Sequence, residues 1–600
     1  MYRLFCCLSL FMLAALAYAP STAQDETAEP KPVDYLIVCA DGLGDAAKEW
    51  ADWRTQYGRV VRLLKLRDIK NEAAPSLEEI KEAIRKEAGG EKPRNGFQVL
   101  LLGDCPVEKS EGYDAGTEIP WQLTPQLDSS PVKSRRARVP TDNYYADLVE
   151  DLDHKPDIAV GRVPACTPEQ ARLALKKVMA YETAPVGEWM RNLTFFAGEG
   201  RFGELVDTML ENLFMQFAEK SISQDYNLRM TYANIRSSYA YAPSRFSHKV
   251  IEEANAGALV LAYMGHGSWD RLDDMYVKVG DKVQRYPILT GNDVKDFAIP
   301  DGKLPVMLII ACDTGYMDHK GECLAERIVF TEKAPVAVLA SSRNSHPYAN
   351  ALLQKAFLAE ITERKRATLG EAMLLAKREL VEAKDPDRVA LDLMAMMILP
   401  DKSERDELNR SHISMYNLTG DPGLRLRHPN VKLAVNPPHE VGPFGLTPGS
   451  KFSMWMKAKA VLIEDDEVPT IPNWRAECTA RRTAIVGQLR PVATSDLVDA
   501  SAEKRKSAED LLAANHAVSN SKTLPGVTAE ISLLGTDARH QRQSFELQWV
   551  IGEDVVPGNY ILKVLVVTKK GDACAFTSHE ITVKEAPQKD APEGENPGDE

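Results

Sequence analysis

Beyond residue 23 the sequence has few cysteines, and no C-x-x-C pair is among them. Seven remain, far apart along the chain: Cys39, Cys105, Cys166, Cys312, Cys323, Cys478 and Cys574. The lack of a C-x-x-C pair argues against a thiolate zinc site, and the scattered spacing is unlike a small disulfide scaffold. Because the number is odd, an exported chain leaves at least one thiol unpaired or paired with another molecule.

An excess of positive charge is also missing. The chain has 73 Lys and Arg residues against 87 Asp and Glu residues, so its net charge is −14. Sequence-independent nucleic-acid binding relies on basic patches at phosphates, and anionic membranes attract polybasic segments. We therefore expect no nucleic-acid partner and no attachment to an anionic lipid surface. The acidity suits cationic substrates or metal cations.

The two ends of the chain are unlike its middle. Arg3 precedes an apolar run over residues 4–19, and small residues follow, which predicts a cleaved signal peptide over residues 1–23. A retained N-terminal anchor is the alternative. No other run reaches the ~18 apolar residues of a spanning helix, so we expect an exported mature chain without a membrane span, whether periplasmic, cell-surface or secreted. Residues 24–33 are interpreted as a leader, and residues 585–600 as a disordered acidic tail.

The middle of the chain begins with alternating strand and helix patterns. A buried-strand run such as Tyr35–Cys39 is followed by helical periodicity over residues 45–57, and similar pairs recur. This alternation predicts an α/β fold with a parallel sheet covered by helices. The alternation starts again near residue 191. This leaves open two half-domains, residues 34–190 and 191–429, or one large sheet.

The pattern changes over residues 430–584. Apolar and polar residues alternate there, and turn signals such as Pro557-Gly558-Asn559 separate the runs. This pattern is typical of an antiparallel β-sandwich of immunoglobulin-like type. A polar helical insertion over residues 501–516 interrupts it. With about 150 residues per domain, 600 residues fit roughly three such units.

Two strand ends carry the residue types of nucleophilic catalysis. One apolar run ends at Gly265-His266-Gly267-Ser268, and another at Cys312-Asp313-Thr314-Gly315. Ligand sites form outside the carboxyl ends of parallel strands, and an imidazole there can take a thiol proton so that the thiolate attacks a carbonyl. The amides of Gly267 and Cys312 could stabilise the resulting oxyanion. Singly, such a cysteine is more often a buried hydrophobe, and such a histidine a turn residue.

Several longer motifs occur in one order along the chain. They are Asp142–Asp147, Asp157–Arg162, Tyr263–Ser268, Ala311-Cys312 with Gly315, Cys323–Glu326, Val336–Ser341 and Asn417–Pro422. Through these motifs, residues 35–427 resemble the gingipain-type cysteine peptidases, in which an immunoglobulin-like domain follows a caspase-like catalytic region. The resemblance implies a cysteine endopeptidase that acts on proteins or peptides and requires no cofactor. Cys312 would be the nucleophile and His266 the general acid/base.

The resemblance also implies roles for residues around this pair. Glu199, after a strand, matches an acidic residue that supports the histidine, although an exposed turn carboxylate fits equally well. Asp207 falls near the acidic residue at the base of the family's S1 pocket, which implies Arg or Lys at P1; a solvated helix face is the alternative. His346 lies in the S1 segment, Ser342–Tyr348, and is expected at the substrate cleft or on the surface. Arg343, in the same segment, departs from the better-known members.

Some functions stay open. Asp142 and Asp147 belong to an acidic cluster that could supply oxygen ligands to a structural calcium ion, but the cluster lacks the EF-hand order, and a solvated loop is the alternative. The chain could instead be a catalytically silent caspase-like surface binding protein, since a fold does not determine a function. A third option is acyl transfer or ligation by the same thiolate. The oligomeric state is not implied by any of these patterns.

Overall fold

The computed structural model of the chain leaves some segments undescribed. It describes residues 31–71, 73–107, 112–125, 138–149, 154–201, 222–397, 399–429, 431–435, 446–447, 449, 451–460, 474–482, 490–520, 527–537, 542–553, 555, 557–568, 571–572 and 574–585. The predicted signal peptide, Asp207 and almost all of the predicted acidic tail lie outside these residues.

The first half consists of alternating strands and helices, as its sequence pattern predicts. Its described elements are β1 (Tyr35–Cys39), α1 (Gly44–Gln56), β2 (Val61–Lys65), α2 (Leu66–Ile69), α3 (Leu77–Ala88), β3 (Gln98–Leu102), β4 (Gln122–Pro125), β5 (Arg138–Thr141), α4 (Asn143–Ala146), β6 (Ala159–Val163) and α5 (Pro168–Thr183). Thr167 begins α5 because its side chain accepts the N–H of Gln170, which is the capping role its position predicts.

The second half repeats the alternation and carries the candidate residues. Its described elements are β7 (Asn192–Ala197), β8 (Asn227–Tyr232), α7 (Phe246–Asn255), β9 (Val260–Met264), β10 (Gly267–Ser268), β11 (Arg271–Leu272), β12 (Asp274–Val279), β13 (Lys282–Pro287), β14 (Val306–Ile310), α8 (Leu324–Val329), β15 (Ala337–Ser341), α9 (Pro347–Thr362), α10 (Leu369–Glu382), α11 (Pro386–Ala395), α12 (Lys402–Met415) and β16 (Tyr416–Thr419). None of the described helices combines the length and the hydropathy that a membrane span requires.

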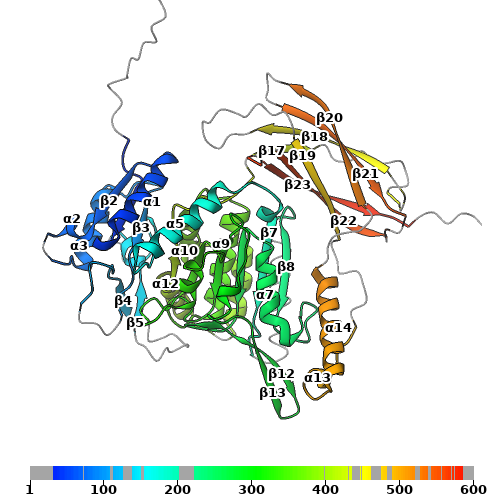
Figure 1. Ribbon diagram of the computed structural model, residues 1–600, viewed down its shortest axis with the longest axis horizontal. Coiled ribbons are helices and arrows are strands. Elements are labelled where there is room, and N and C mark those ends of the chain that lie inside the picture. The colour runs from blue at the N-terminus through cyan, green and yellow to red at the C-terminus, as the bar shows by residue number, and fades with distance from the viewer. Residues whose placement is uncertain are drawn as a thin grey trace, which may run out of the picture.

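The two halves share one sheet, which confirms the predicted α/β class. In the described chain its strand order is β2-β1-β3-β6-β16-β15-β14-β9-β7-β8, with helices packed on the sheet (Figure 1). Strand β16 is parallel to β6 but antiparallel to β15, so the strands of the first half run opposite to those of the second. The carboxyl ends of β9, β14 and β15 therefore lie at the same end of the sheet, and the carboxyl ends of the first half's strands lie at the opposite end.

The strands that deliver the candidate residues are apolar for a physical reason. All five residues of β14, Val306–Ile310, are buried, and so are four of the five in β9. A central parallel strand has helices on both faces, so it must be apolar at every position rather than at alternate ones. Such a strand can expose polar side chains only where it ends, and this confines chemistry to the residues that follow it.

The last part of the chain forms two antiparallel sheets. They are β17-β18-β21-β20 and β19-β22-β23 among the described residues. The elements are β17 (Val431–Val435), β18 (Lys451–Ala460), β19 (Trp474–Arg482), α13 (Thr494–Val498), α14 (Ala502–Asn520), β20 (Val527–Asp537), β21 (Arg542–Ile551), β22 (Gly558–Thr568) and β23 (Cys574–Val583). The two sheets agree with the predicted sandwich; its immunoglobulin-like type stays a prediction.

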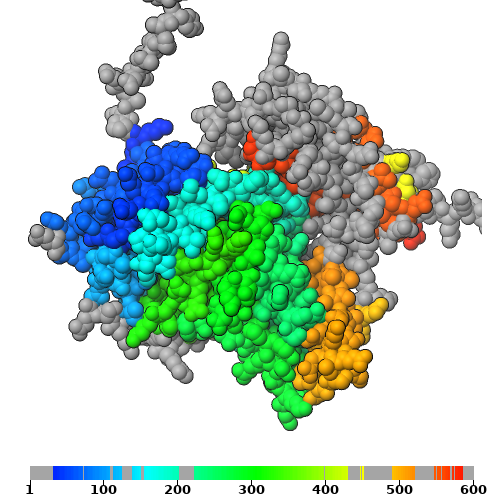
Figure 2. Space-filling model, in the orientation of Figure 1, coloured from blue at the N-terminus to red at the C-terminus, as the bar shows by residue number. Residues whose placement is uncertain are grey.

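The predicted helical insertion reaches back to the second half. Figures 1 and 2 show α13 and α14, in orange, alongside the green second half. The Asn520 side chain accepts the N–H of Met230 at 2.8 Å and donates to its carbonyl at 2.7 Å. Met230 lies in β8, the edge strand, so an amide side chain here satisfies backbone groups that a neighbouring strand would otherwise pair. The Glu509 carboxylate accepts the Ser244 hydroxyl at 2.8 Å.

Candidate active site

The ends of β9 and β14 bring the predicted histidine and cysteine together. The strands are parallel neighbours, and Met264 pairs with Ile310 as the last residue of each. His266 and Cys312 each follow two residues beyond this pair, and the Gly265 N–H donates to the Ile310 carbonyl at 3.2 Å. The parallel register therefore places both residues at the same level, just after the carboxyl ends of two adjacent strands.

Gly267 shows how closely the two strand ends pack. A Cβ atom added to Gly267 would lie 2.8 Å from Thr314 Cγ2, 2.9 Å from Ala311 Cβ and 2.9 Å from the Cys312 carbonyl oxygen. Real Cβ atoms do not approach other atoms this closely, so any larger residue would push the segments apart. The glycine after the histidine thus allows the histidine turn to contact the cysteine strand directly.

The Cys312 thiol is partly buried and has defined partners. The Ser345 N–H donates to Sγ at 3.3 Å, and the thiol in turn donates to the Ser345 carbonyl oxygen at 3.7 Å. Burial raises the pKa of the thiol, and the Ser345 N–H and the Ser345 hydroxyl, whose Oγ lies 3.9 Å from Sγ, oppose that rise. The resting group is therefore a thiol at neutral pH, and it needs a base to become a nucleophile.

The His266 ring has an orientation that identifies its basic nitrogen. Nε2 lies 3.1 Å from the carbonyl oxygen of Gly200, which follows β7. A carbonyl oxygen only accepts, so Nε2 carries the proton and Nδ1 keeps the lone pair of the neutral ring. The buried Tyr263 hydroxyl donates to the His266 carbonyl at 2.8 Å and so holds the backbone of the turn.

Glu199 lies one residue before the carbonyl that orients the histidine. Its Oε1 accepts the side-chain amide of Asn234 at 3.2 Å. The His266 ring itself contacts the backbone carbonyl of the next residue, Gly200. The structure therefore places Glu199 beside the histidine, and its supporting role stays a prediction.

The two amides predicted for the oxyanion also lie at the carboxyl ends of these strands. Gly267 is opposite Leu272 in the short hairpin of β10 and β11, but the Leu272 N–H donates to the Leu289 carbonyl at 2.8 Å. The pair thus has the non-hydrogen-bonded geometry, in which the Gly267 N–H points away from its partner strand. The Cys312 amide follows the end of β14. Stabilisation of an oxyanion by these two groups stays a prediction.

Arg343 does not project into a substrate pocket. Its guanidinium is fully buried and donates to Asp318 through two nitrogens, at 2.7 Å and 2.6 Å, while it also lies over the Tyr316 ring. Bidentate pairing of this kind satisfies both charges inside the protein. Arg343 therefore stabilises the loop after β14 through its ion pair with Asp318.

His346 has a structural contact of its own. Its Nδ1 accepts the Tyr348 N–H at 3.2 Å, which caps the start of α9, and its N–H donates to His412 Nε2 at 2.9 Å. Burial lowers the pKa of His346 to about 4, so the ring is neutral. A role in substrate binding stays a prediction, as does the role of Asp207, which lies outside the described residues.

Asp142 pairs with an arginine. Arg162 donates to its two oxygens at 2.8 Å and 2.6 Å, and the Asp147 carboxylate lies 4.0 Å from His154 Nδ1. No three His, Cys, Asp or Glu side chains are grouped as metal ligands within the described residues. The calcium site is thus a prediction without a located ligand set.

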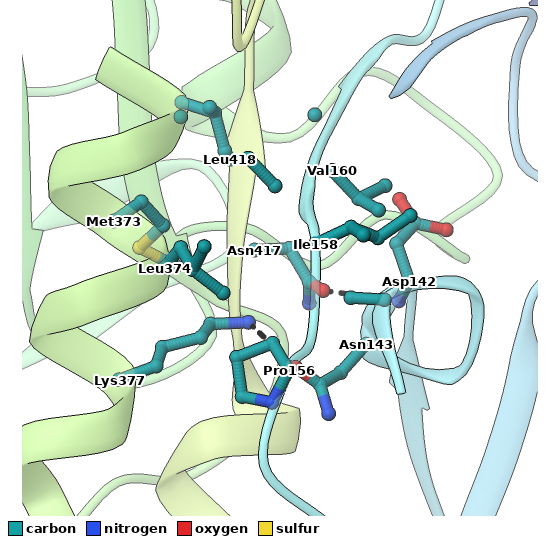
Figure 3. A pocket seen from close by; sticks show the side chains of 14 residues that line it. Asp142, Asn143, Pro156, Ile158, Val160, Met373, Leu374, Lys377, Asn417 and Leu418 are labelled. Carbon is teal, nitrogen blue, oxygen red and sulfur yellow. Dashed lines mark hydrogen bonds between the residues drawn. The ribbon is translucent and has the colours of Figure 1, made fainter. Parts of the chain in front are cut away.

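A pocket beside Asp142 is separate from the cysteine. Figure 3 shows it, with an empty volume of about 340 Å³, and neither Cys312 nor His266 lines it. Lys377 points to Asn143 in this view, and its Nζ donates to Oδ1 at 3.3 Å. Burial lowers the pKa of Lys377 to about 7. The pocket belongs to the junction of the two halves.

Sequence reasoning missed two contributors to the site. Tyr263 is inside the quoted histidine motif, yet no local pattern shows that its hydroxyl turns back to the His266 carbonyl. Ser345 is inside the quoted S1 segment, and its contact with Cys312 joins loops that follow different strands. An apolar run can identify a strand end but not the partner of a loop amide.

A family model and several known proteins match much of the chain. A model of the family described as Peptidase family C25 matches residues 28–427. Lys-gingipain of Porphyromonas gingivalis is 24% identical over 322 residues, which cover 52% of this chain and 16% of that protein. Gingipain R2 of the same organism is 22% identical over 321 residues, which cover 52% and 36%. The chain therefore spans well under half of the length of either relative.

Solved structures are similar over most of the chain. The Arg-specific cysteine proteinase gingipain R has a TM-score of 0.48 at 15% identity, covering 93% of this chain and 99% of that one. Dimeric latent PorU from Porphyromonas gingivalis has a TM-score of 0.35 at 13% identity, covering 94% and 44%.

Proposed function

The chain belongs to peptidase family C25, and from this membership we propose that it is an exported cysteine endopeptidase with Cys312 as nucleophile and His266 as general acid/base. The observation that carries the assignment is the parallel register of β9 and β14, which sets the two residues just beyond the carboxyl ends of neighbouring strands. A partly exposed cysteine near an oriented imidazole is what acyl transfer to sulfur requires.

The orientation of the ring gives each nitrogen a task. His266 Nδ1 takes the proton of the Cys312 thiol while Nε2–H stays bonded to the Gly200 carbonyl. The thiolate attacks the scissile carbonyl carbon, and the Gly267 and Cys312 amides stabilise the oxyanion. Nδ1 then returns the proton to the leaving amine. Water hydrolyses the thioester, and the thiol is restored.

The relatives suggest the residue at P1. Lys-gingipain is named for lysine, and gingipain R is described as Arg-specific. We extend this preference for a basic P1 residue to the present chain, together with export to the periplasm, cell surface or medium. An acidic protein of net charge −14 suits such cationic substrates.

Fluorogenic peptides with Arg, Lys, Asp or Asn at P1 test the proposal. Under reducing conditions, with calcium or with a chelator, the protein should cleave the Arg or Lys peptides. Cys312→Ala and His266→Ala should each abolish turnover. Cys166→Ala is the matched control, because Cys166 is an exposed cysteine whose thiol donates to Asp104 and not to the site. Cleavage by Cys312→Ala would remove the assignment.

The alternative of a catalytically silent binding protein has its own result. It is favoured if no peptide of the panel is cleaved although Cys312 is alkylated normally, because the thiol would then be accessible without a reaction. Ligation of product to an added amine would instead indicate acyl transfer.

A further inference from the structure

The loop between β15 and α9 lies against the Cys312 sulfur. The Ser345 N–H donates to Sγ at 3.3 Å, and the Ser345 carbonyl accepts from the thiol at 3.7 Å. Ser345 is only 4% exposed, so solvent competes little for its amide. A nearby N–H stabilises the ionised sulfur, whereas a carbonyl contact favours the neutral thiol. Ionisation therefore loses the carbonyl contact and strengthens the amide contact.

Side chains from two other elements hold Ser345 in this position. Asn350, in the first turn of α9, donates from Nδ2 to Ser345 Oγ at 2.9 Å, and the Tyr416 hydroxyl of β16 donates to Asn350 Oδ1 at 2.7 Å. Asn350 is 6% exposed and Tyr416 is fully buried. The next residue is held through its backbone, because the His346 N–H donates to His412 Nε2 at 2.9 Å.

The charges around the thiol increase the need for such a donor. Asp313, on the same loop, adds to the rise that burial causes in the pKa of the thiol. Tyr263 from β9 and Tyr416 from β16 are neutral, because burial raises their pKa values. His346 at the start of α9 is neutral as well, since burial lowers its pKa to about 4. His266, in the turn after β9, is the proton acceptor of the proposed function.

We propose that the Ser345 amide is a catalytic donor that stabilises the Cys312 thiolate, and that Asn350 and Tyr416 are positioning residues that hold it against the sulfur. The part played in turnover rests on the proposed function. The ionisation of the thiol does not, because it can be measured without a substrate.

Site-resolved alkylation of Cys312 by iodoacetamide, quantified by mass spectrometry across a pH series, measures the thiol pKa in the full chain. Tyr416→Phe and Asn350→Ala should each raise this pKa and slow alkylation at pH 7 by about tenfold, the effect of weakening one hydrogen bond to a charged group. Tyr145→Phe is the matched control. Tyr145 is also fully buried and donates its hydroxyl at 2.7 Å, but to the Pro120 carbonyl.

Circular dichroism identifies any variant that fails to fold. If either Tyr416→Phe or Asn350→Ala does not fold, the other variant still tests the proposal. Wild-type pH profiles in folded Tyr416→Phe or Asn350→Ala protein would overturn the proposal, and so would an equal change in Tyr145→Phe. If the wild type cleaves no peptide but the profiles shift as expected, the donor role stands and the peptidase assignment fails. If peptides are cleaved and the profiles do not shift, the peptidase assignment stands and the donor role fails.

Discussion

Replacing Gly267 by alanine tests the contact between the two strand ends that carry His266 and Cys312 most directly. The added Cβ would lie within 3.0 Å of three atoms: Thr314 Cγ2, Ala311 Cβ and the Cys312 carbonyl oxygen. Gly267 does not have the positive φ that disfavours larger residues, so the backbone itself accepts alanine. The substitution therefore adds steric pressure at one place, between the histidine turn and the end of β14.

The contact distances set the expected size of the effect. Two of the three atoms belong to the backbone or are attached to it directly, so they cannot move away as a flexible side chain would. Overpacking of this kind costs about 1–3 kcal/mol of folding stability. A displacement of reacting groups by about 1 Å lowers a rate by roughly 100-fold. We expect Gly267→Ala to fold and to lose about 100-fold in kcat/KM.

The assay compares kcat/KM on the best peptide of the P1 panel with the alkylation rate of Cys312. Gly187→Ala is the control, because Gly187 has extended backbone and its added Cβ would make only an ordinary contact, 3.7 Å from Trp189. Thr314→Ser in the Gly267→Ala background removes the methyl group that the new Cβ meets, and it should restore part of the activity.

A folded Gly267→Ala protein with kcat/KM within about threefold of wild type would refute the reasoning, since a 1 Å displacement should cost far more. It would mean that the two strand ends do not pack as described. If Gly267→Ala loses activity and the added Thr314→Ser restores none of it, the steric explanation is wrong.

Two further predictions concern the histidine turn and the buried imidazoles. Tyr263→Phe removes the hydroxyl that holds the His266 carbonyl, and it should lower kcat about tenfold with little change in KM; an unchanged kcat would contradict a positioning role. His412 and His516 are buried, and burial lowers their pKa values from 6.5 to about 4. The unfolded chain binds these protons first as pH falls, so their contribution to stability is complete above pH 6.5 and is lost toward pH 4, by about 3 kcal/mol each. Urea unfolding at pH 7 and pH 4.5 should show a lower midpoint at pH 4.5, and equal midpoints would count against neutral buried rings.

Much of the fold could be predicted because the information is local. An apolar run such as Val306–Ile310 identifies a central strand, and the polar residue types after it identify a strand end. Thr167 before Pro168 identifies a helix start, and its side chain does cap that helix. Residues 501–516 have helical periodicity, and α14 is found there.

The rest depended on residues far apart in sequence. Arg343 departs from the better-known family members, but no local pattern shows that Asp318 neutralises its charge inside the protein. No local pattern shows that Arg162 donates to both oxygens of Asp142, and calcium binding there stays a prediction. A charged side chain in a sequence does not show whether a counter-charge from another strand will reach it.

The sequence by itself determined many of the strands and helix starts and placed the histidine and cysteine of the proposed chemistry at strand ends, because hydrophobic periodicity and capping act over a few neighbouring residues. Only the tertiary structure decided that the strands of the two halves run in opposite directions within one sheet, that Nε2 of His266 contacts the Gly200 carbonyl, and that Asn350 and Tyr416 hold the loop whose Ser345 amide contacts the sulfur. These features arise where separate elements meet, and a hydrogen bond between them exists only once the packing of the sheet and its helices has set the distance.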